Sequence, residues 1–237
     1  MIAAAGPECV AVKPQLACFE RLGAPGWAAL EEVVGLARDA GLLVVADGKR
    51  GDVPTSALAY GQALVGEMET PWGRVEGLGA DAFTANPLLG GDAVEPLLAA
   101  AEAANAGAFF LVRTSNPGAA DLQDLDCDGA PLHERIAGMV AAQAPRLAGT
   151  DGTSGVGAVV GATAPEHLGR LRELMPDSIF LIPGVGAQGG EPGALGPAVA
   201  EGRPASVLVA ASRSIANADD PARAAESLAR AVWEATT

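Results

Sequence analysis

The stretch Leu42–Ser56, LLVVADGKRGDVPTS, decides the predicted fold. Its four apolar residues from Leu42 predict a strand that is buried on both faces. The run then ends in Asp47, Lys49 and Asp52. Because Asp47 and Lys49 are two positions apart, we expect them on the same side of the strand. Parallel α/β folds place their chemistry at the carboxyl ends of strands, so the stretch predicts a parallel sheet that carries a charged site.

The rest of the chain alternates short apolar strands with Ala-rich helices, as parallel sheets with helical crossovers do. Predicted strands are Cys9–Lys13, Leu42–Asp47, Ala82–Asn86, Ala108–Thr114, Val156–Gly161, Ile179–Pro183 and Ser206–Ala210. Predicted helices are Gly26–Ala40, Thr55–Glu67, Asp92–Asn105, Pro131–Ala144, Pro165–Met175, Pro192–Gly202 and Asp219–Glu234. Ala119–Gly129 and Gly149–Gly155 are expected to be surface loops. Seven such βα units predict either an open doubly wound sheet or a (β/α)8 TIM barrel that lacks its first βα unit.

Composition favours a single domain over residues 1–237, since the chain is 49% hydrophobic with a mean hydropathy of +0.25. A formal charge of −14 disfavours nucleic acid and membrane surfaces as partners. Three scattered cysteines predict a reducing cytoplasm without structural disulfides or zinc. No basic leader and no apolar run of about 18 residues is present, so we expect neither export nor a membrane span.

A charged cluster is the first candidate site. Asp47, Lys49 and Asp52 alone are a common pattern, and a structural ion pair that keeps the loop soluble would explain them. Lys13 favours a catalytic cluster over a structural ion pair. It ends the preceding predicted strand, and consecutive strands are usually neighbours, so its side chain can reach Asp47. An ammonium held between carboxylates keeps its charge and can donate a proton to a carbanion that forms beside it.

A glycine-rich loop is the second candidate site. PGVGAQGG at 183–190 follows a predicted strand and precedes a predicted helix, so its backbone can approach an oxyanion closely. Arg213, after the last strand, could clamp the same group. The alternative is a plain tight turn with Arg213 paired to a surface acid. Barrels bind phosphate with the loops after their last two strands, so the two features together favour phosphate. No Walker motif or dinucleotide spacing is present, which argues against ATP and NAD.

Three further features have ordinary structural explanations. Ser115 and Asn116 in RTSNPG at 113–118 could bind a planar polar ring, but Asn-Pro-Gly is also a common turn. In TANPLLG at 84–90, Asn86 is expected to cap the next turn. His133 and His167 lack ligand spacing, so we assign them no metal and expect surface or cap positions.

Six ordered motifs resemble orotidine 5'-phosphate decarboxylase, and the type 2 branch most of all. They are VKPQ at 12–15, DGKRGDV at 47–53, TSNPG at 114–118, VGAVVGAT at 156–163, PGVGAQGG at 183–190 and SRSI at 212–215. The resemblance implies a cofactor-free (β/α)8 barrel that converts orotidine 5'-phosphate to UMP and carbon dioxide in pyrimidine biosynthesis. It also implies a homodimer with active sites at the subunit interface and no metal.

The resemblance also implies roles for individual residues. Lys13, Asp47, Lys49 and Asp52 would form the family's alternating array, in which Asp52 reaches the partner's site and Lys49 protonates C6. Asp47 would lie against the substrate carboxylate and so favour its departure. Ser115 would bind the pyrimidine, and the loop from Pro183 would bind the phosphate together with Gln188 and Arg213. Further substrate contacts are implied for Val53, Ser56 and Ser212.

The chain departs from the family pattern at its start, where the family has a further strand with a ribose-binding Asp and a helix upstream of Cys9. It also has Gly48 where the branch usually has Ala. Three alternatives follow: a magnesium-dependent phosphosugar enzyme such as a hexulose-phosphate synthase, a Schiff-base aldolase that uses Lys49, and an inactive truncated relative that binds nucleotide or dimerises. TSNPG and GAQGG argue against the first, and the carboxylates beside Lys49 argue against the second.

Overall fold

A computed structural model describes residues 1–237, which divide into two compact units. The N-terminal unit comprises Cys9–Ala108 with Ile2, and the C-terminal unit comprises Phe109–Thr237 with Met1 and Ala3–Glu8. No helix combines the length and the apolar character that crossing a membrane requires. That the chain forms one domain stays a prediction.

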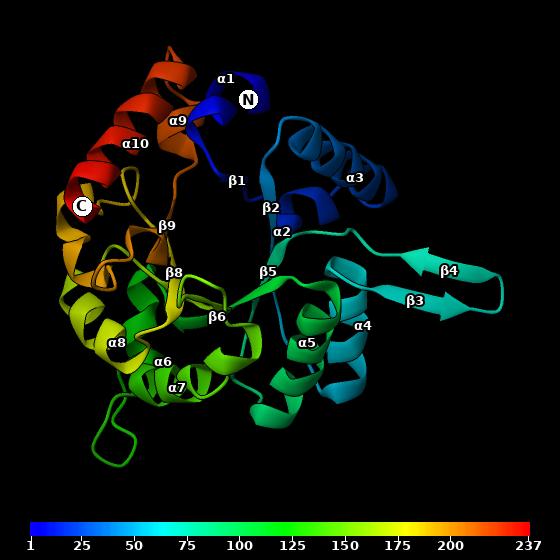
Figure 1. The fold of residues 1–237 in the computed structure, drawn as a ribbon, viewed down its shortest axis with the longest axis horizontal. Helices are drawn as coiled ribbons and strands as arrows, with labels where there is room; N and C mark the ends of the chain where they lie inside the picture. Colours follow the sequence, from blue (N-terminus) through cyan, green and yellow to red (C-terminus); the bar gives the residue numbers. More distant parts are fainter. The chain divides into compact units, whose positions relative to one another are not determined.

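The N-terminal unit contains three neighbouring strands of a seven-stranded sheet, in the order β1, β2, β5 (Figure 1). Both pairs are parallel, with Val12 opposite Val44 and Ala46 opposite Phe83. Helices α4 and α5 pack against each other, and the antiparallel hairpin β3–β4 extends away from them (Figure 1). The elements are β1 (Ala11–Val12), α2 (Leu16–Glu20), α3 (Ala24–Asp39), β2 (Leu43–Arg50), α4 (Pro54–Leu64), β3 (Glu67–Thr70), β4 (Gly73–Glu76), β5 (Ala82–Ala85) and α5 (Gly91–Ala104).

The C-terminal unit contains β7, β8 and β9, and it begins inside β6. The strands are β6 (Gly107–Arg113), β7 (Ser154–Val160), β8 (Ser178–Pro183) and β9 (Val207–Ala210). The α-helices are α1 (Ile2–Ala5, apart from Ile2 itself), α6 (Ala120–Gln123), α7 (Leu132–Ala141), α8 (Leu168–Leu174), α9 (Arg213–Ala216) and α10 (Pro221–Thr236). Short 3₁₀ turns are η1 (Gly6–Glu8), η2 (Pro117–Ala119), η3 (Ala144–Leu147), η4 (Pro165–His167), η5 (Pro192–Ala194), η6 (Gly196–Ala198) and η7 (Pro204–Ser206).

All seven predicted strands are present, and six predicted helical segments contain an α-helix. The helix predicted at Pro192–Gly202 is wrong, because that segment forms only the turns η5 and η6. Pro197 lacks the N–H that an α-helix interior needs, and Gly193 and Gly196 weaken helix formation further. The loop predicted at Ala119–Gly129 contains the short helix α6, and the hairpin β3–β4 lies where the sequence predicted no strand.

The parallel register aligns the carboxyl ends of neighbouring strands within each unit. Gln15 forms a bridge with Asp47 just beyond the paired part of β1. In the C-terminal unit Pro183 is opposite Ala210 at the ends of β8 and β9. Buried strand residues hold these ends in place, among them Val44, Phe83, Phe110, Val160 and Phe180. Side chains that follow the strands therefore meet at one edge of the sheet in each unit.

Candidate active site

The carboxyl ends of β1 and β2 bring two lysines onto one carboxylate. Lys13 Nζ donates to Asp47 Oδ2, and Lys49 Nζ lies 2.5 Å from Asp47 Oδ1. Lys13 and Asp47 are 34 residues apart in sequence, and their contact confirms that the strands they follow are neighbours. A carboxylate between two ammonium groups leaves the cluster one positive charge in excess, so it can attract an anion.

Asp47 is the buried centre of this cluster, with 3% of its surface exposed. Burial raises the pKa of Asp47, but the charge of Lys13 and the hydrogen bonds and charge of the two lysines lower it more. The pKa of Asp47 therefore lies below its ordinary value of 3.8. The group is a carboxylate at neutral pH, and the neighbouring lysines compensate its burial.

Lys49 has an unusual backbone conformation, with φ of +49°. Residues with a Cβ rarely adopt this left-handed region, because Cβ approaches the following carbonyl oxygen. The register of β2 against β5 shifts here, since Ala46 is opposite Phe83 but Arg50 is opposite Ala85. Bulges of this kind re-aim side chains at the edges of sheets, and this one turns Lys49 back toward Asp47.

Asp52, Val53 and Ser56 occupy the segment that leads from β2 into α4. The Asp52 carboxylate accepts a hydrogen bond of 2.7 Å from the Val53 N–H and makes no ion pair with Lys49 in the described chain. Val53 is exposed, and Ser56 is half-buried in the first turn of α4. Of the four predicted charges, the chain itself thus brings together Lys13, Asp47 and Lys49 and leaves Asp52 apart.

The glycine-rich loop of the C-terminal unit is joined to the serine of TSNPG. Ser115 Oγ donates to Gln188 Oε1 at 2.9 Å, across 73 residues of sequence. Thr163 Oγ1 donates to the Ser115 carbonyl at 2.9 Å, so the ends of β6, β7 and β8 meet at this serine. A Cβ on Gly161 would lie 2.7 Å from the Ser115 Cα, and only glycine permits this approach.

Loop 183–190 folds back on itself at the end of β8. The Gly190 N–H donates to the Gly184 carbonyl at 3.0 Å, and Gly184, Gly186 and Gly189 all have positive φ. A Cβ on Gly186 would lie 3.2 Å from Ser214 Oγ, so the loop approaches the start of α9. Ser212 and Arg213 are exposed at that same helix start. Pro183, Gln188, Ser212 and Arg213 are therefore close in the fold, although far apart in sequence.

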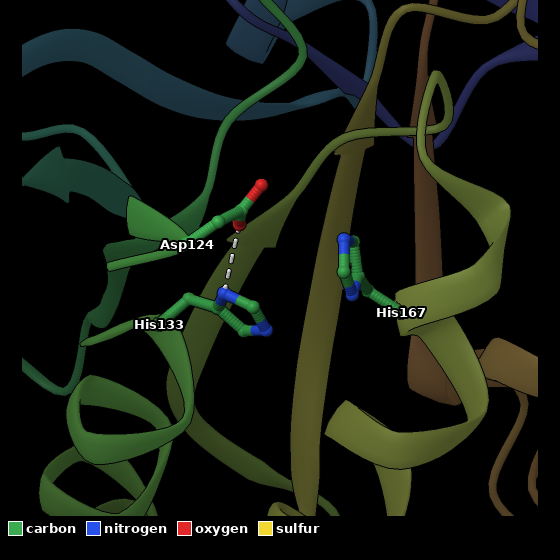
Figure 2. Close-up of side chains that lie close together, drawn as sticks. All are labelled: Asp124, His133 and His167. Atoms are coloured by element: carbon green, nitrogen blue, oxygen red, sulfur yellow. Dashed lines mark ion pairs between the residues drawn. The ribbon is translucent and has the colours of Figure 1, made fainter. Parts of the chain in front are cut away.

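A partly buried network forms around Arg113, two residues before Ser115 in the chain, and it corrects the prediction for His133. Arg113 holds Asp124 through two contacts, Nε to Oδ1 at 2.8 Å and Nη2 to Oδ2 at 3.0 Å. Figure 2 shows His133 directed at the same carboxylate, with Nδ1 3.1 Å from Oδ1. His133 is only 2% exposed, rather than at the surface, because α7 packs its first turn inward. A long-range packing choice of this kind leaves no signal in local sequence.

Asp124, His133 and His167 also place potential metal ligands within 4.8 Å of one another (Figure 2). The rings of His133 and His167 meet edge to face at 4.7 Å. Both carboxylate oxygens, however, already accept from Arg113, and the guanidinium charge opposes a cation. Arg113 Nη1 also donates to the Thr114 carbonyl at 2.8 Å, and Gln123 bonds Thr114. The cluster therefore anchors the backbone that presents Ser115.

Comparison with known proteins identifies the family. A profile of the orotidine 5'-phosphate decarboxylase / HUMPS family matches residues 1–228. The chain belongs to this family. It is 47% identical over 182 residues to an orotidine 5'-phosphate decarboxylase of Rhodopirellula baltica, and 42% identical over 216 residues to one of Deinococcus radiodurans. These matches cover 76% and 91% of the chain, but 58% and 74% of the respective relatives.

Solved structures of the decarboxylase / HUMPS family show the same fold. The OMP decarboxylase of Leishmania donovani superposes with a TM-score of 0.79 at 34% identity, over 99% of this chain and 84% of that one. The family and the barrel-type α/β fold predicted from the sequence are thus confirmed.

Two further residues contact the charged cluster, and neither was predicted from the sequence. Gln15 Nε2 lies 3.3 Å from Asp47 Oδ2, and Thr84 Oγ1 donates to Asp47 Oδ1 at 2.9 Å. Gln15 lies in VKPQ, so its closeness to Lys13 was a usable signal. Thr84 lies in TANPLLG, where Asn86 accepts from the Leu88 N–H at 3.0 Å and so caps the turn as predicted. Only the pairing of β2 with β5 reveals the contact of Thr84.

Proposed function

We propose that this chain converts orotidine 5'-phosphate to UMP and carbon dioxide without a metal or organic cofactor. The observation that carries the proposal is the contact of Lys13 and Lys49 with the buried carboxylate of Asp47. Family membership and the names of the similar proteins support the same reaction.

In the proposed reaction, Asp47 lies beside the substrate carboxylate, and their like charges oppose each other in the ground state. Loss of carbon dioxide disperses one of these charges, so the repulsion falls toward the transition state. The electron pair of the broken bond remains on C6 as a carbanion. Lys49 Nζ then transfers a proton to C6, and Asp47 stabilises the ammonium before the transfer.

Binding of the rest of the nucleotide is assigned to the C-terminal unit. Ser115 binds the pyrimidine, and loop 183–190, with Gln188, Ser212 and Arg213, binds the phosphate. The positive-φ glycines and the exposed guanidinium support this assignment. Val53 and Ser56, at the start of α4, complete the proposed substrate contacts. Binding energy from the distant phosphate would then hold the reacting ring in position.

The proposal includes a homodimer in which Asp52 enters the partner's site. Its carboxylate makes no ion pair with Lys49 in its own chain, and the adjoining Val53 is 56% exposed, which supports a role outside the chain. Mixing inactive Lys49→Ala with inactive Asp52→Asn tests this. Exchange of subunits should restore about a quarter of the wild-type activity. About half of the dimers are then mixed, and each mixed dimer regains one of its two sites. No recovery on mixing, with dimers shown by sedimentation, would exclude a shared site. We place the reaction in the cytoplasm, as the scattered cysteines suggest.

The decisive assay follows release of labelled carbon dioxide from carboxyl-labelled orotidine 5'-phosphate in the presence of EDTA. Activity that survives EDTA supports the proposal, whereas activity that requires magnesium would favour the phosphosugar alternative. Borohydride trapping of a substrate adduct on Lys49 would favour the Schiff-base alternative. Tight UMP binding without turnover would identify a non-catalytic relative.

A further inference from the structure

Thr84 lies directly opposite the bulge that carries the charged cluster. Between the paired positions Ala46–Phe83 and Arg50–Ala85, β2 contributes Asp47, Gly48 and Lys49, while β5 contributes only Thr84. Thr84 is 1% exposed. Its hydroxyl donates to Asp47 Oδ1 at 2.9 Å and accepts from the Lys49 backbone N–H at 2.9 Å. A single buried hydroxyl is therefore hydrogen-bonded to both residues of the proposed proton-transfer pair.

The chemistry of this position requires a group that both donates and accepts. The bulge removes the Lys49 N–H from the strand ladder, and a buried N–H without an acceptor is costly. The carboxylate of Asp47 requires donors, and the O–H of Thr84 supplies one beside Lys49 Nζ. Among side chains of this size, valine has the same shape as threonine but offers neither function.

We propose that Thr84 is a positioning residue for proton transfer, which holds Lys49 and Asp47 at the mutual distance and orientation that the reaction needs. This inference rests on the proposed decarboxylation. Lys49 occupies a sparsely populated backbone region at φ of +49°, so its side chain returns to Asp47 only while the bulge is held. The Thr84 hydroxyl holds the bulge through the Lys49 N–H and fixes the carboxylate rotamer through Oδ1.

A purely structural role predicts a different outcome from a positioning role. If Thr84 only fills space and satisfies an N–H, its loss lowers thermal stability and leaves the reaction of the folded protein intact. If it positions the pair, its loss changes turnover and the titration of Asp47 while substrate affinity is retained. Loss of a donor to the carboxylate removes stabilisation of its charged form, so the pKa of Asp47 should rise.

The test compares Thr84→Val with Thr84→Ser. Thr84→Val should lower kcat by about 10- to 100-fold with little change in KM, and it should move the acidic limb of the rate profile to higher pH. Thr84→Ser keeps the hydroxyl and should restore most of the rate. Thr153→Val is the matched control, because Thr153 is also a buried threonine that donates to an aspartate, Asp151, at 2.7 Å, but outside the site. It should retain the wild-type rate and pH profile.

Carbon-13 NMR titration of the Asp47 carboxyl keeps the test independent of turnover. If the wild-type protein does not decarboxylate orotidine 5'-phosphate, the proposed function fails, yet Thr84→Val should still raise the pKa of Asp47 and shift the Lys49 amide resonance. If the wild type is active and Thr84→Val keeps its kcat and pH profile, the positioning role is refuted. An unchanged titration of Asp47 in that variant refutes it as well. Should Thr84→Val fail to fold, Thr84→Ala takes its place beside the serine variant.

Discussion

The left-handed conformation of Lys49 predicts that Lys49→Gly is more stable than Lys49→Ala, although both variants are inactive. Lys49→Gly and Lys49→Ala both remove the ammonium that contacts Asp47, so both lose the same ion pair. They differ in how they tolerate φ of +49°, which glycine adopts freely and alanine does not. Comparing the two therefore isolates the backbone strain at position 49 from the charge of its side chain.

The size of the difference follows from that strain. A residue with a Cβ is disfavoured in this region by roughly 1–2 kcal/mol, and the greater freedom of glycine in the unfolded chain offsets part of the gain. Lys49→Gly should thus exceed Lys49→Ala in free energy of unfolding by about 1 kcal/mol, which corresponds to a melting temperature higher by roughly 2–4 °C for a chain of this size. Both variants should lose decarboxylation by a factor of about 100 to 10,000, the usual contribution of a general acid.

Two measurements check this reasoning: urea unfolding of the two variants, and decarboxylation with UMP binding as a control for an intact nucleotide site. UMP binding should persist in both, because the proposed phosphate contacts lie in the C-terminal unit. Near-normal turnover in either variant would refute the role of Lys49. Equal stability of the two variants would refute the strain assigned to its backbone.

Three further predictions concern charge and burial. The pKa of Asp47 is lowered, so its contribution to stability is present above about pH 4 and is lost as pH falls through the pKa of the folded protein. Asp47→Asn should therefore weaken the fall of the unfolding free energy below about pH 4, and an unchanged pH dependence would contradict this. Burial, and then the charge of His133, lower the pKa of His167 from 6.5, so the unfolded chain binds the proton more readily and stability falls as pH drops below about 6.5. His167→Gln should reduce that loss of stability below about pH 6.5, measured by chemical unfolding. Arg172 is buried, its guanidinium donates to the carbonyls of Ala198, Met175, Ser178 and Ser206, and burial lowers its pKa to about 10. Arg172→Met should cost about 3–5 kcal/mol or prevent folding, while Arg170→Met on the exposed face of the same helix should change the melting temperature little.

Part of the site was predictable because it depends on residues that are close together in the sequence. The apolar run from Leu42 specifies a strand by composition alone. The two-residue spacing also predicted that Asp47 and Lys49 lie on one side of the strand, although the structure makes their contact through the bulge of β2 rather than through a regular strand. The glycines of loop 183–190 indicate positive φ from residue type, and the structure has it at Gly184, Gly186 and Gly189. Lys13 was predicted from its place at the end of the preceding strand, and the resemblance to the family added a role for Ser115 through a short motif. The failure at Pro192–Gly202 was also local, since its prolines and glycines opposed the helix that was predicted there.

The sequence by itself determined the order of strands and helices and the residue types available for chemistry, because periodicity and backbone preference act over a few neighbouring residues. Only the tertiary structure decided that β2 bulges against β5, that Thr84 bonds both Asp47 and Lys49, and that His133 is buried. These contacts join residues tens of positions apart. They depend on strand register and on which faces pack together, and both are set by the summed packing of many side chains rather than by any local pattern.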